Sequence, residues 1–174
     1  MDYEKAAAYW TDRAAAPDAR PMERDALRAE VERFIASHNT CALATAGADG
    51  FVRCTPLEYA WWRGAFWMLS EGGLKFRALA TNDNICLAIY DTYQGFGTLG
   101  GMQVTGTADI IEPWSPDYLA LLDHKGLPAD RLRALPSPMH LIKVTPTAID
   151  FLCSSLKEQG LDSRQHLDFE VNTD

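Results

Sequence analysis

Apolar and polar side chains alternate along much of the segment from Asn39 to Asp91, and a period of two residues is typical of β-strands. The segment holds three apolar runs rich in Val, Ile, Phe, Trp and Tyr. Asp49-Gly50 and Arg63-Gly64 lie between apolar stretches, and such dipeptides predict antiparallel hairpins. Two later runs, 102–111 and 139–152, continue the pattern. We therefore expect the core to be a meandering antiparallel sheet.

Helical spacing of apolar residues appears before and after these strands. We predict one helix over residues 2–15 and a second over residues 22–37, with a proline-bounded break between them. Near residue 115, Ser115-Pro116 has the residue types that open a helix, with Ser as the cap and Pro in the first turn. These helices are expected to cover the sheet.

A glycine pair follows the third apolar run and leads into a string of good helix formers. Ser70 precedes the pair Gly72-Gly73, and Lys75 and Arg77 follow it. Backbone N–H groups at a helix start, glycines that let a ligand approach, and two cations together predict an anion site that suits a phosphate. The alternative is a plain strand-to-helix turn with two solvated cations.

The second apolar run carries a cation and a hydroxyl on one face. Arg53, Thr55 and Leu57 share that face, because side chains alternate along a strand. Pro56 cannot donate a hydrogen bond to a neighbouring strand, so the strand is interrupted or lies at an edge there. The polar side chains of this face are expected to meet a ligand. The alternative is a rim position, with Arg53 paired to a nearby carboxylate.

The composition restricts the classes of partner. A chain of 174 residues that is 47% hydrophobic can bury a core as a single domain. A formal charge of -8 without a run of Lys or Arg argues against binding of nucleic acid. The start of the chain lacks a cationic flank followed by an apolar core, and no apolar segment approaches the roughly 20 residues of a membrane helix. We expect a cytoplasmic protein without membrane contact.

The sequence shows little chemical machinery of its own. The four cysteines lie in apolar runs without CxxC spacing, so we expect buried free thiols rather than a disulfide framework. The four histidines lack HxxxH and HExxH spacing, and no metal site is predicted. No GxSxG turn is present, and we predict no catalytic side chain. An enzyme of this kind would depend on a cofactor.

Several stretches together resemble a known family. These are FIASHNTCALATAGADGFVRCTPLEYAW, FWMLSEGGLKFRALATNDNICLAIYD, GMQVTGTADII and HLIKVTPTAIDFL. In order and spacing they resemble the pyridoxamine 5'-phosphate oxidase-like FMN-binding split-barrel proteins over about residues 34–155. The resemblance implies a mainly β fold, a six-stranded antiparallel split barrel with flanking helices. We accordingly expect one domain over 1–174, with a helical N-terminal extension (1–37), the barrel (39–155) and a C-terminal tail (156–174).

The resemblance also implies a cofactor and its contacts. It places FMN in a cleft shared by two subunits, so a homodimer is expected. The cofactor-binding residues that it implies are Arg53, Thr55, Leu57, Ser70, Lys75 and Gln103. Gln103 lies two residues nearer Gly106 than in the oxidases proper. Five aromatic residues between 59 and 67 give a second reason to expect self-association, although they could instead cap the barrel core.

The match to the vitamin B6 oxidases themselves is weaker. Arg164 and His166 resemble the late Arg-x-His that contacts the B6 substrate, but Leu152 stands where those oxidases carry a tryptophan. The side chains that grip the substrate phosphate have no clear counterpart around Tyr118, so its charged contacts would be missing.

Three functions therefore remain open. The first is an FMN-dependent oxidoreductase that passes electrons from NADH or NADPH to a small planar acceptor such as a quinone or nitroaromatic compound. The second is an FMN-binding or stress-related module with little turnover. The third is pyridoxamine 5'-phosphate oxidation. The sequence leaves open whether haem or a deazaflavin replaces FMN.

Overall fold

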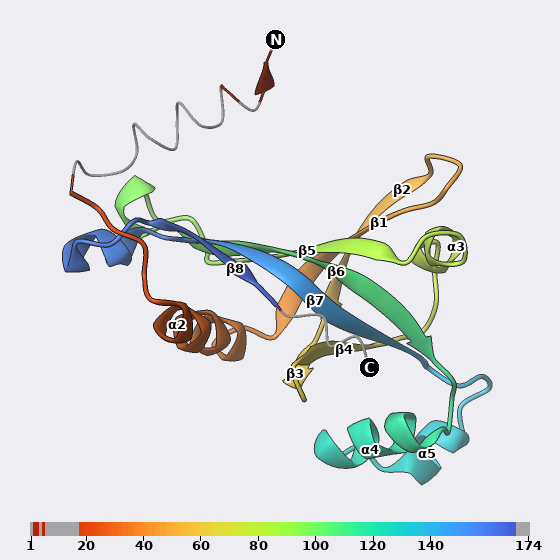
Figure 1. Cartoon of the computed structure of the whole chain (residues 1–174). Helices are drawn as coiled ribbons and strands as arrows, with labels where there is room; N and C mark the ends of the chain where they lie inside the picture. Colours follow the sequence, from red (N-terminus) through yellow and green to blue (C-terminus); the bar gives the residue numbers. More distant parts are fainter. Residues whose placement is uncertain (1, 4, 6–17, 170–174) are drawn as a thin grey trace.

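The computed structural model describes residues 2–3, 5 and 18–169, and their strands form one antiparallel sheet (Figure 1). Along this sheet the strand order is β2-β1-β5-β6-β7-β4-β3, and β8 pairs with β7. The strands are β1 (Thr40–Ala46), β2 (Val52–Glu58), β3 (Ala60–Trp62), β4 (Ala65–Ser70), β5 (Asn84–Tyr90), β6 (Gly100–Ile111), β7 (His140–Cys153) and β8 (Arg164–Asp168). The mainly β, antiparallel fold predicted from the sequence is confirmed, and the sheet holds eight strands where the resemblance implies six.

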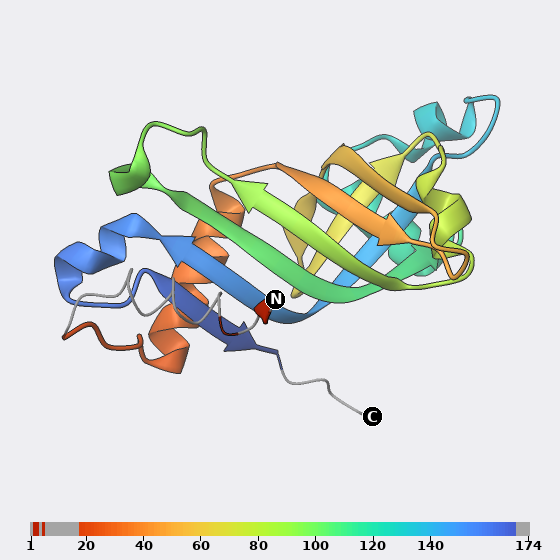
Figure 2. The same ribbon diagram turned by 90° about the horizontal axis from the view of Figure 1, so that it is seen from above.

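The sheet curls because one of its faces is apolar. On β1 every second side chain is buried, and Leu43 is fully enclosed. Leu87 of β5, Val104 of β6 and Ile149 of β7 lie in the same buried cluster. Strand β2 also contacts β4, which brings the two ends of the sheet toward each other. The inner face of the curled sheet therefore forms the main core, and no described helix covers the other face (Figure 2).

One long helix covers the inner face near β8. Helix α2 (Arg24–Ala36) buries Leu27, Val31 and Ile35 against the core, as the apolar stripe of the predicted second helix indicates. Figure 1 shows it beneath β7 and β8. The first predicted helix, 2–15, lies almost entirely outside the described residues. Among the described residues, no helix is long and apolar enough to cross a membrane.

Shorter helices occupy the connections. They are α3 (Lys75–Leu79), α4 (Pro116–His124), α5 (Ala129–Arg133) and the 3-10 helices η1 (Phe96–Thr98) and η2 (Ser154–Gln159). The predicted cap of α4 is confirmed, because the Ser115 hydroxyl accepts a hydrogen bond from the Tyr118 N–H at 3.3 Å. Tyr118, Leu121 and Leu122 then pack with Trp67 in a second buried cluster.

The aromatic residues between 59 and 67 pack largely against other residues of the same chain. Tyr59 and Phe66 belong to the main core, and the Tyr59 hydroxyl donates to the Ile35 carbonyl at 2.7 Å. Trp67 is also buried, and its indole N–H donates to the Trp62 carbonyl at 2.8 Å. Packing within the chain thus explains this cluster, and it gives no separate support for self-association.

Two other expectations need adjustment. The segment predicted as a C-terminal tail contains η2 and β8, and Gln165 and Leu167 of β8 are buried. The expectation of four buried thiols is wrong: Cys41 is buried, but Cys54 is exposed and the other two are half-buried. Cys54 lies on the edge strand β2, whose outer face no described element covers, and a sequence pattern alone does not reveal which edge stays open.

Candidate cofactor site

The turn after β4 is built on two glycines with unusual backbone angles. Gly72 has φ of 139° and Gly73 has φ of 109°, a region that residues with a Cβ rarely adopt. The buried Ser70 hydroxyl closes this turn, donating to the Gly72 carbonyl at 3.2 Å and accepting from the Gly72 N–H at 3.3 Å. The predicted glycine turn is therefore present and leads directly into α3.

Lys75 is the most informative residue of this turn. Its side chain is buried, with only 4% of the residue exposed, and its ammonium donates to the Gly72 carbonyl and lies 4.9 Å from the centre of the Phe76 ring. Within the described part of the chain Lys75 forms no ion pair with a carboxylate. Burial accordingly lowers the pKa of the Lys75 ammonium. A buried cation without a counter-charge is unfavourable, so this position suits an incoming anion.

The predicted anion site depends on Lys75 more than on the helix. Helix α3 has five residues, so its N-terminus contributes little on its own. Arg77 faces away from the turn and pairs with Asp49 at 2.7 Å. Together with the Phe51 N–H, which is the larger influence, Arg77 lowers the pKa of the Asp49 carboxyl. Arg77 therefore binds Asp49 of the β1–β2 hairpin.

Strand β2 presents its predicted face as expected. Thr55 and Leu57 are half-buried, whereas Arg53 is exposed, and Arg53 forms no ion pair with any described carboxylate. The alternative of a structural pairing for Arg53 is therefore not observed. Helix α3 packs against both β1 and β2. Lys75 of α3 and strand β2 therefore belong to one region of the molecule.

Sequence reasoning missed one residue in this region. Thr45 of β1 pairs directly with Arg53 of β2, and only 2% of Thr45 is exposed. Its hydroxyl has no hydrogen-bond partner among the described residues. The signal was present in the sequence, because Thr45 is the polar member of the alternating inward set Cys41, Leu43 and Thr45.

The other predicted site residues gather elsewhere, around a cavity of about 700 Å³. Gln103, Arg164 and His166 all line this cavity. They meet because Gln103 of β6 pairs with Asp150 of β7, and Asp150 pairs with His166 of β8. The structure therefore brings Gln103 together with Arg164 and His166, which lie far from it in sequence.

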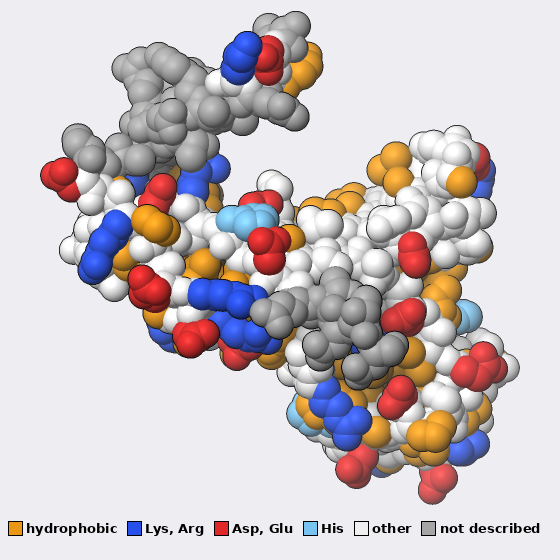
Figure 3. Space-filling model, viewed as in Figure 1, with side chains coloured by type: hydrophobic (Ala, Val, Ile, Leu, Met, Phe, Trp, Pro, Cys, Tyr) orange, Lys and Arg blue, Asp and Glu red, His pale blue; other side chains and the backbone are white. Residues whose placement is uncertain are grey.

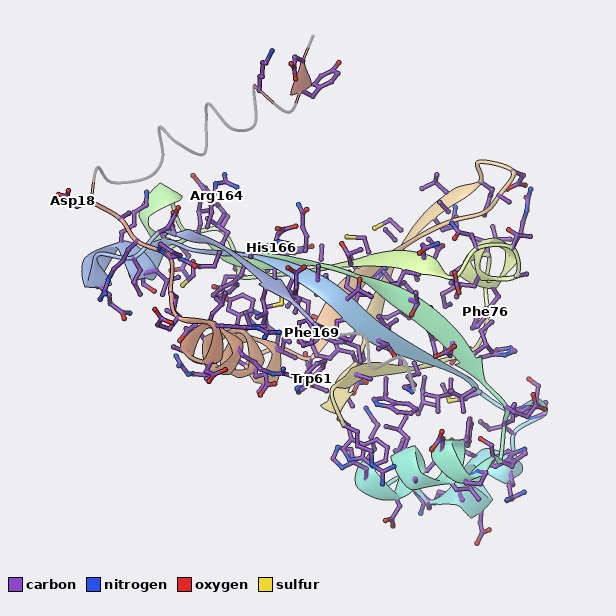
Figure 4. The ribbon with its side chains drawn as sticks, in the orientation of Figure 1. Asp18, Trp61, Phe76, Arg164, His166 and Phe169 are labelled. Atoms are coloured by element: carbon purple, nitrogen blue, oxygen red, sulfur yellow. The ribbon has the colours of Figure 1, made fainter. Side chains whose placement is uncertain are left out.

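His166 is held between two carboxylates that the sequence analysis did not identify. Its Nδ1 lies 2.7 Å from Asp150 Oδ1, and its Nε2 lies 3.1 Å from Asp168 Oδ1. These contacts raise the pKa of the His166 imidazole, and the one from Asp150 is the larger influence. Acidic side chains flank a histidine in the middle of Figure 3, where Figure 4 labels His166. Strand pairing brings Asp150 to His166, whereas Asp168 lies two residues along the same strand and so points to the same face.

The candidate residues on β2 and those around the cavity lie on opposite faces of the sheet. Ladder partners point to the same side, and the ladder connects Gln103 through Ala88 and Ala42 to Pro56. Pro56 alternates with Thr55 and Leu57, which point to the other side. Figure 4 likewise shows Arg164 and His166 over β8, far from Phe76 beside α3. Within one chain the two groups therefore point away from each other.

The family profile described as pyridoxamine 5'-phosphate oxidase matches residues 27–153. No curated protein matches the sequence significantly.

Several solved structures share the fold. ChuZ from Campylobacter jejuni is 18% identical with a TM-score of 0.64, over 84% of this chain and 61% of ChuZ. The heme storage protein HutZ from Vibrio cholerae is 18% identical with a TM-score of 0.55, over 67% of this chain and 87% of HutZ. A FAD-binding protein from Mesorhizobium loti is 16% identical with a TM-score of 0.57, over 70% of this chain and 89% of that protein. At these identities the similarity shows the fold.

Proposed function

The chain belongs to the pyridoxamine 5'-phosphate oxidase family, and we propose that it is an FMN-dependent oxidoreductase. In this proposal, electrons pass from NADH or NADPH to a small planar acceptor such as a quinone or a nitroaromatic compound. Bound FMN would supply the hydride and electron transfer, so no side chain need act as a general acid.

The observation that carries the proposal is the buried ammonium of Lys75, which donates to a carbonyl and forms no ion pair in the described structure. A flavin phosphate would give this cation its counter-charge, and charge-assisted hydrogen bonds are the strong ones. Ser70 would add a hydroxyl donor beside it. Arg53, Thr55 and Leu57 would line the path of the cofactor along β2.

A homodimer accounts for the division of the site between two faces. We propose that two copies pack so that the flavin held by Lys75 of one copy reaches Gln103 of the other. The outer face of the sheet supports this arrangement, because it exposes the apolar side chains of Val52 and Tyr90. Gln103 would then orient the cofactor by a hydrogen bond, and the partner copy would exclude water from the cleft.

The cavity beside Gln103 is proposed to receive the electron acceptor. Arg164 can contact a polar group of that molecule. His166 has both ring nitrogens engaged by Asp150 and Asp168, so it offers its ring face more readily than an N–H group. Leu152 gives the cavity an apolar wall suited to a planar molecule.

The structure disfavours the vitamin B6 oxidase alternative. Tyr118 is fully buried, and its hydroxyl donates to the Met139 carbonyl at 3.0 Å. It is therefore unavailable to a substrate phosphate. Release of hydrogen peroxide on addition of pyridoxamine 5'-phosphate would restore that alternative.

The second candidate is a binding module with little turnover. It is favoured by the fold shared with HutZ, whose name describes heme storage. An absorbance spectrum of the purified protein distinguishes flavin from heme. Anaerobic mixing of the FMN-loaded protein with NADH or NADPH, followed by an acceptor panel, then tests for turnover. Bleaching and recovery of the flavin band support the oxidoreductase, and an unchanged band with both donors supports the binding module.

A further inference from the structure

The unpartnered hydroxyl of Thr45 is an exception within a well-packed core. Side chains on the inner face of β1 are otherwise apolar, and Leu43 beside it is fully buried. Buried polar atoms nearly always have a hydrogen-bond partner, because an unsatisfied hydroxyl loses its interaction with water. A valine has almost the same shape and would avoid this loss. The hydroxyl therefore requires an explanation other than packing.

The position of Thr45 connects it with the anion site. A Cβ on Gly47, two residues beyond Thr45, would lie 3.5 Å from the Cα of Ala78 in α3. Ala78 and Lys75 are three residues apart and both are buried, so they share the face of α3 that packs against the sheet. Thr45 accordingly lies at the end of the core that α3 covers.

Two further polar groups converge on this end of the core. Arg53 is the direct cross-strand partner of Thr45, and its side chain points to the same face of the β1–β2 hairpin. Ser70 lies at the end of β4, where the glycine turn begins, and only 6% of it is exposed. Two cations and two hydroxyls thus surround one end of an otherwise apolar core, and no carboxylate pairs with either cation in the described structure.

We propose that Thr45 is a further cofactor-binding residue, whose hydroxyl donates a hydrogen bond to an oxygen of the phosphate or ribityl chain of the bound flavin. This inference rests on the proposed function. Since Thr45, Ser70 and Lys75 are all more than nine-tenths buried, the ligand reaches them only when the glycine turn and α3 shift outward. Nothing lies within 4 Å of a Cβ placed on Gly72, so no described side chain packs directly against the turn at that position.

The test compares Thr45→Val, Thr45→Ser and the wild type in the full-length chain. FMN affinity is measured by quenching of flavin fluorescence, and the melting temperature is measured without ligand. We expect Thr45→Val to weaken FMN binding by about three- to tenfold for a bond to a neutral ribityl oxygen and by about tenfold or more for a bond to the charged phosphate, and to melt at the same or a higher temperature. Thr45→Ser retains a hydroxyl and should bind like the wild type. Thr40→Val, at the exposed start of the same strand, is the matched control and should change neither quantity.

The outcomes separate the two proposals. If Thr45→Val binds FMN like the wild type while Lys75→Met binds it weakly, Thr45 is no ligand and the proposed function stands. A large loss of melting temperature in ligand-free Thr45→Val would show a structural role and overturn the inference. If the wild type does not bind FMN, both proposals fail together.

Discussion

Replacement of Lys75 by methionine tests the proposed function directly. Methionine retains an unbranched side chain of similar length and removes the charge together with the hydrogen bond to the Gly72 carbonyl. Lys75 is 4% exposed and its ammonium donates only to a backbone carbonyl, so the change deletes no ion pair of the ligand-free protein. Any effect on FMN affinity should therefore come from the lost contact with the cofactor.

The magnitude follows from the kind of contact. A hydrogen bond to a charged group contributes about 1.5–3 kcal/mol. Since about 1.4 kcal/mol corresponds to a tenfold change, the dissociation constant for FMN should rise by about 10- to 150-fold. The stability of the ligand-free protein should not fall, because burial disfavours the charged form of Lys75 and lowers its pKa. The melting temperature of ligand-free Lys75→Met should equal or exceed that of the wild type.

The assay is a titration of ligand-free protein with FMN, followed by fluorescence quenching and repeated at low and high salt. Lys157→Met is the matched control, because it removes one exposed cation in η2, away from the glycine turn, and should bind FMN like the wild type. Equal FMN affinity of Lys75→Met and Lys157→Met would refute the assignment of Lys75 to the phosphate.

Three further predictions follow from the geometry. The pKa of His166 lies above its reference value of 6.5 because Asp150 and Asp168 stabilise the imidazolium, so its stabilising effect is complete below about pH 6.5 and is lost as the pH rises through the folded-state value. The difference in melting temperature between wild type and His166→Gln should shrink from about pH 6 to pH 9, and a difference that grows over this range would contradict the two contacts. Burial raises the pKa of the Cys41 thiol to about 12, so iodoacetamide at about pH 8 should leave Cys41 unmodified in the folded protein and react with it after denaturation. Mass spectrometry checks this, and early labelling would show that the β1 core opens. Gly73→Ala imposes a Cβ at φ of 109°, 3.6 Å from the Lys75 ammonium, and should lower the free energy of unfolding by about 1–3 kcal/mol and weaken FMN binding. Denaturant titration tests the first effect, and an unchanged midpoint would show that the turn relaxes.

The local pattern of the sequence determined the strands from β1 to β7, the α2 helix and the glycine turn, but not β8. Alternation with a period of two specifies a half-buried strand wherever it occurs, because side chains of a strand point alternately to its two faces. The Ser115 cap and the Gly72-Gly73 turn were equally readable, since each depends on residues that are close in sequence. The buried state of Lys75 was not readable, because its neighbours in sequence do not enclose it.

Only the tertiary structure decided which side chains meet. Asp150 reaches His166 through the pairing of β7 with β8, and strand register depends on contacts between distant segments rather than on local preference. The pairing of β6, β5, β1 and β2 showed that Gln103 and Thr55 lie on opposite faces, which is consistent with the shared-cleft proposal. Thr45 lies in the sequence as a polar residue of a strand, and only the folded structure revealed that its hydroxyl is buried without a described partner. The alternation of apolar and polar residues specifies which way a side chain points. The partners of that side chain depend on the three-dimensional packing of the whole chain.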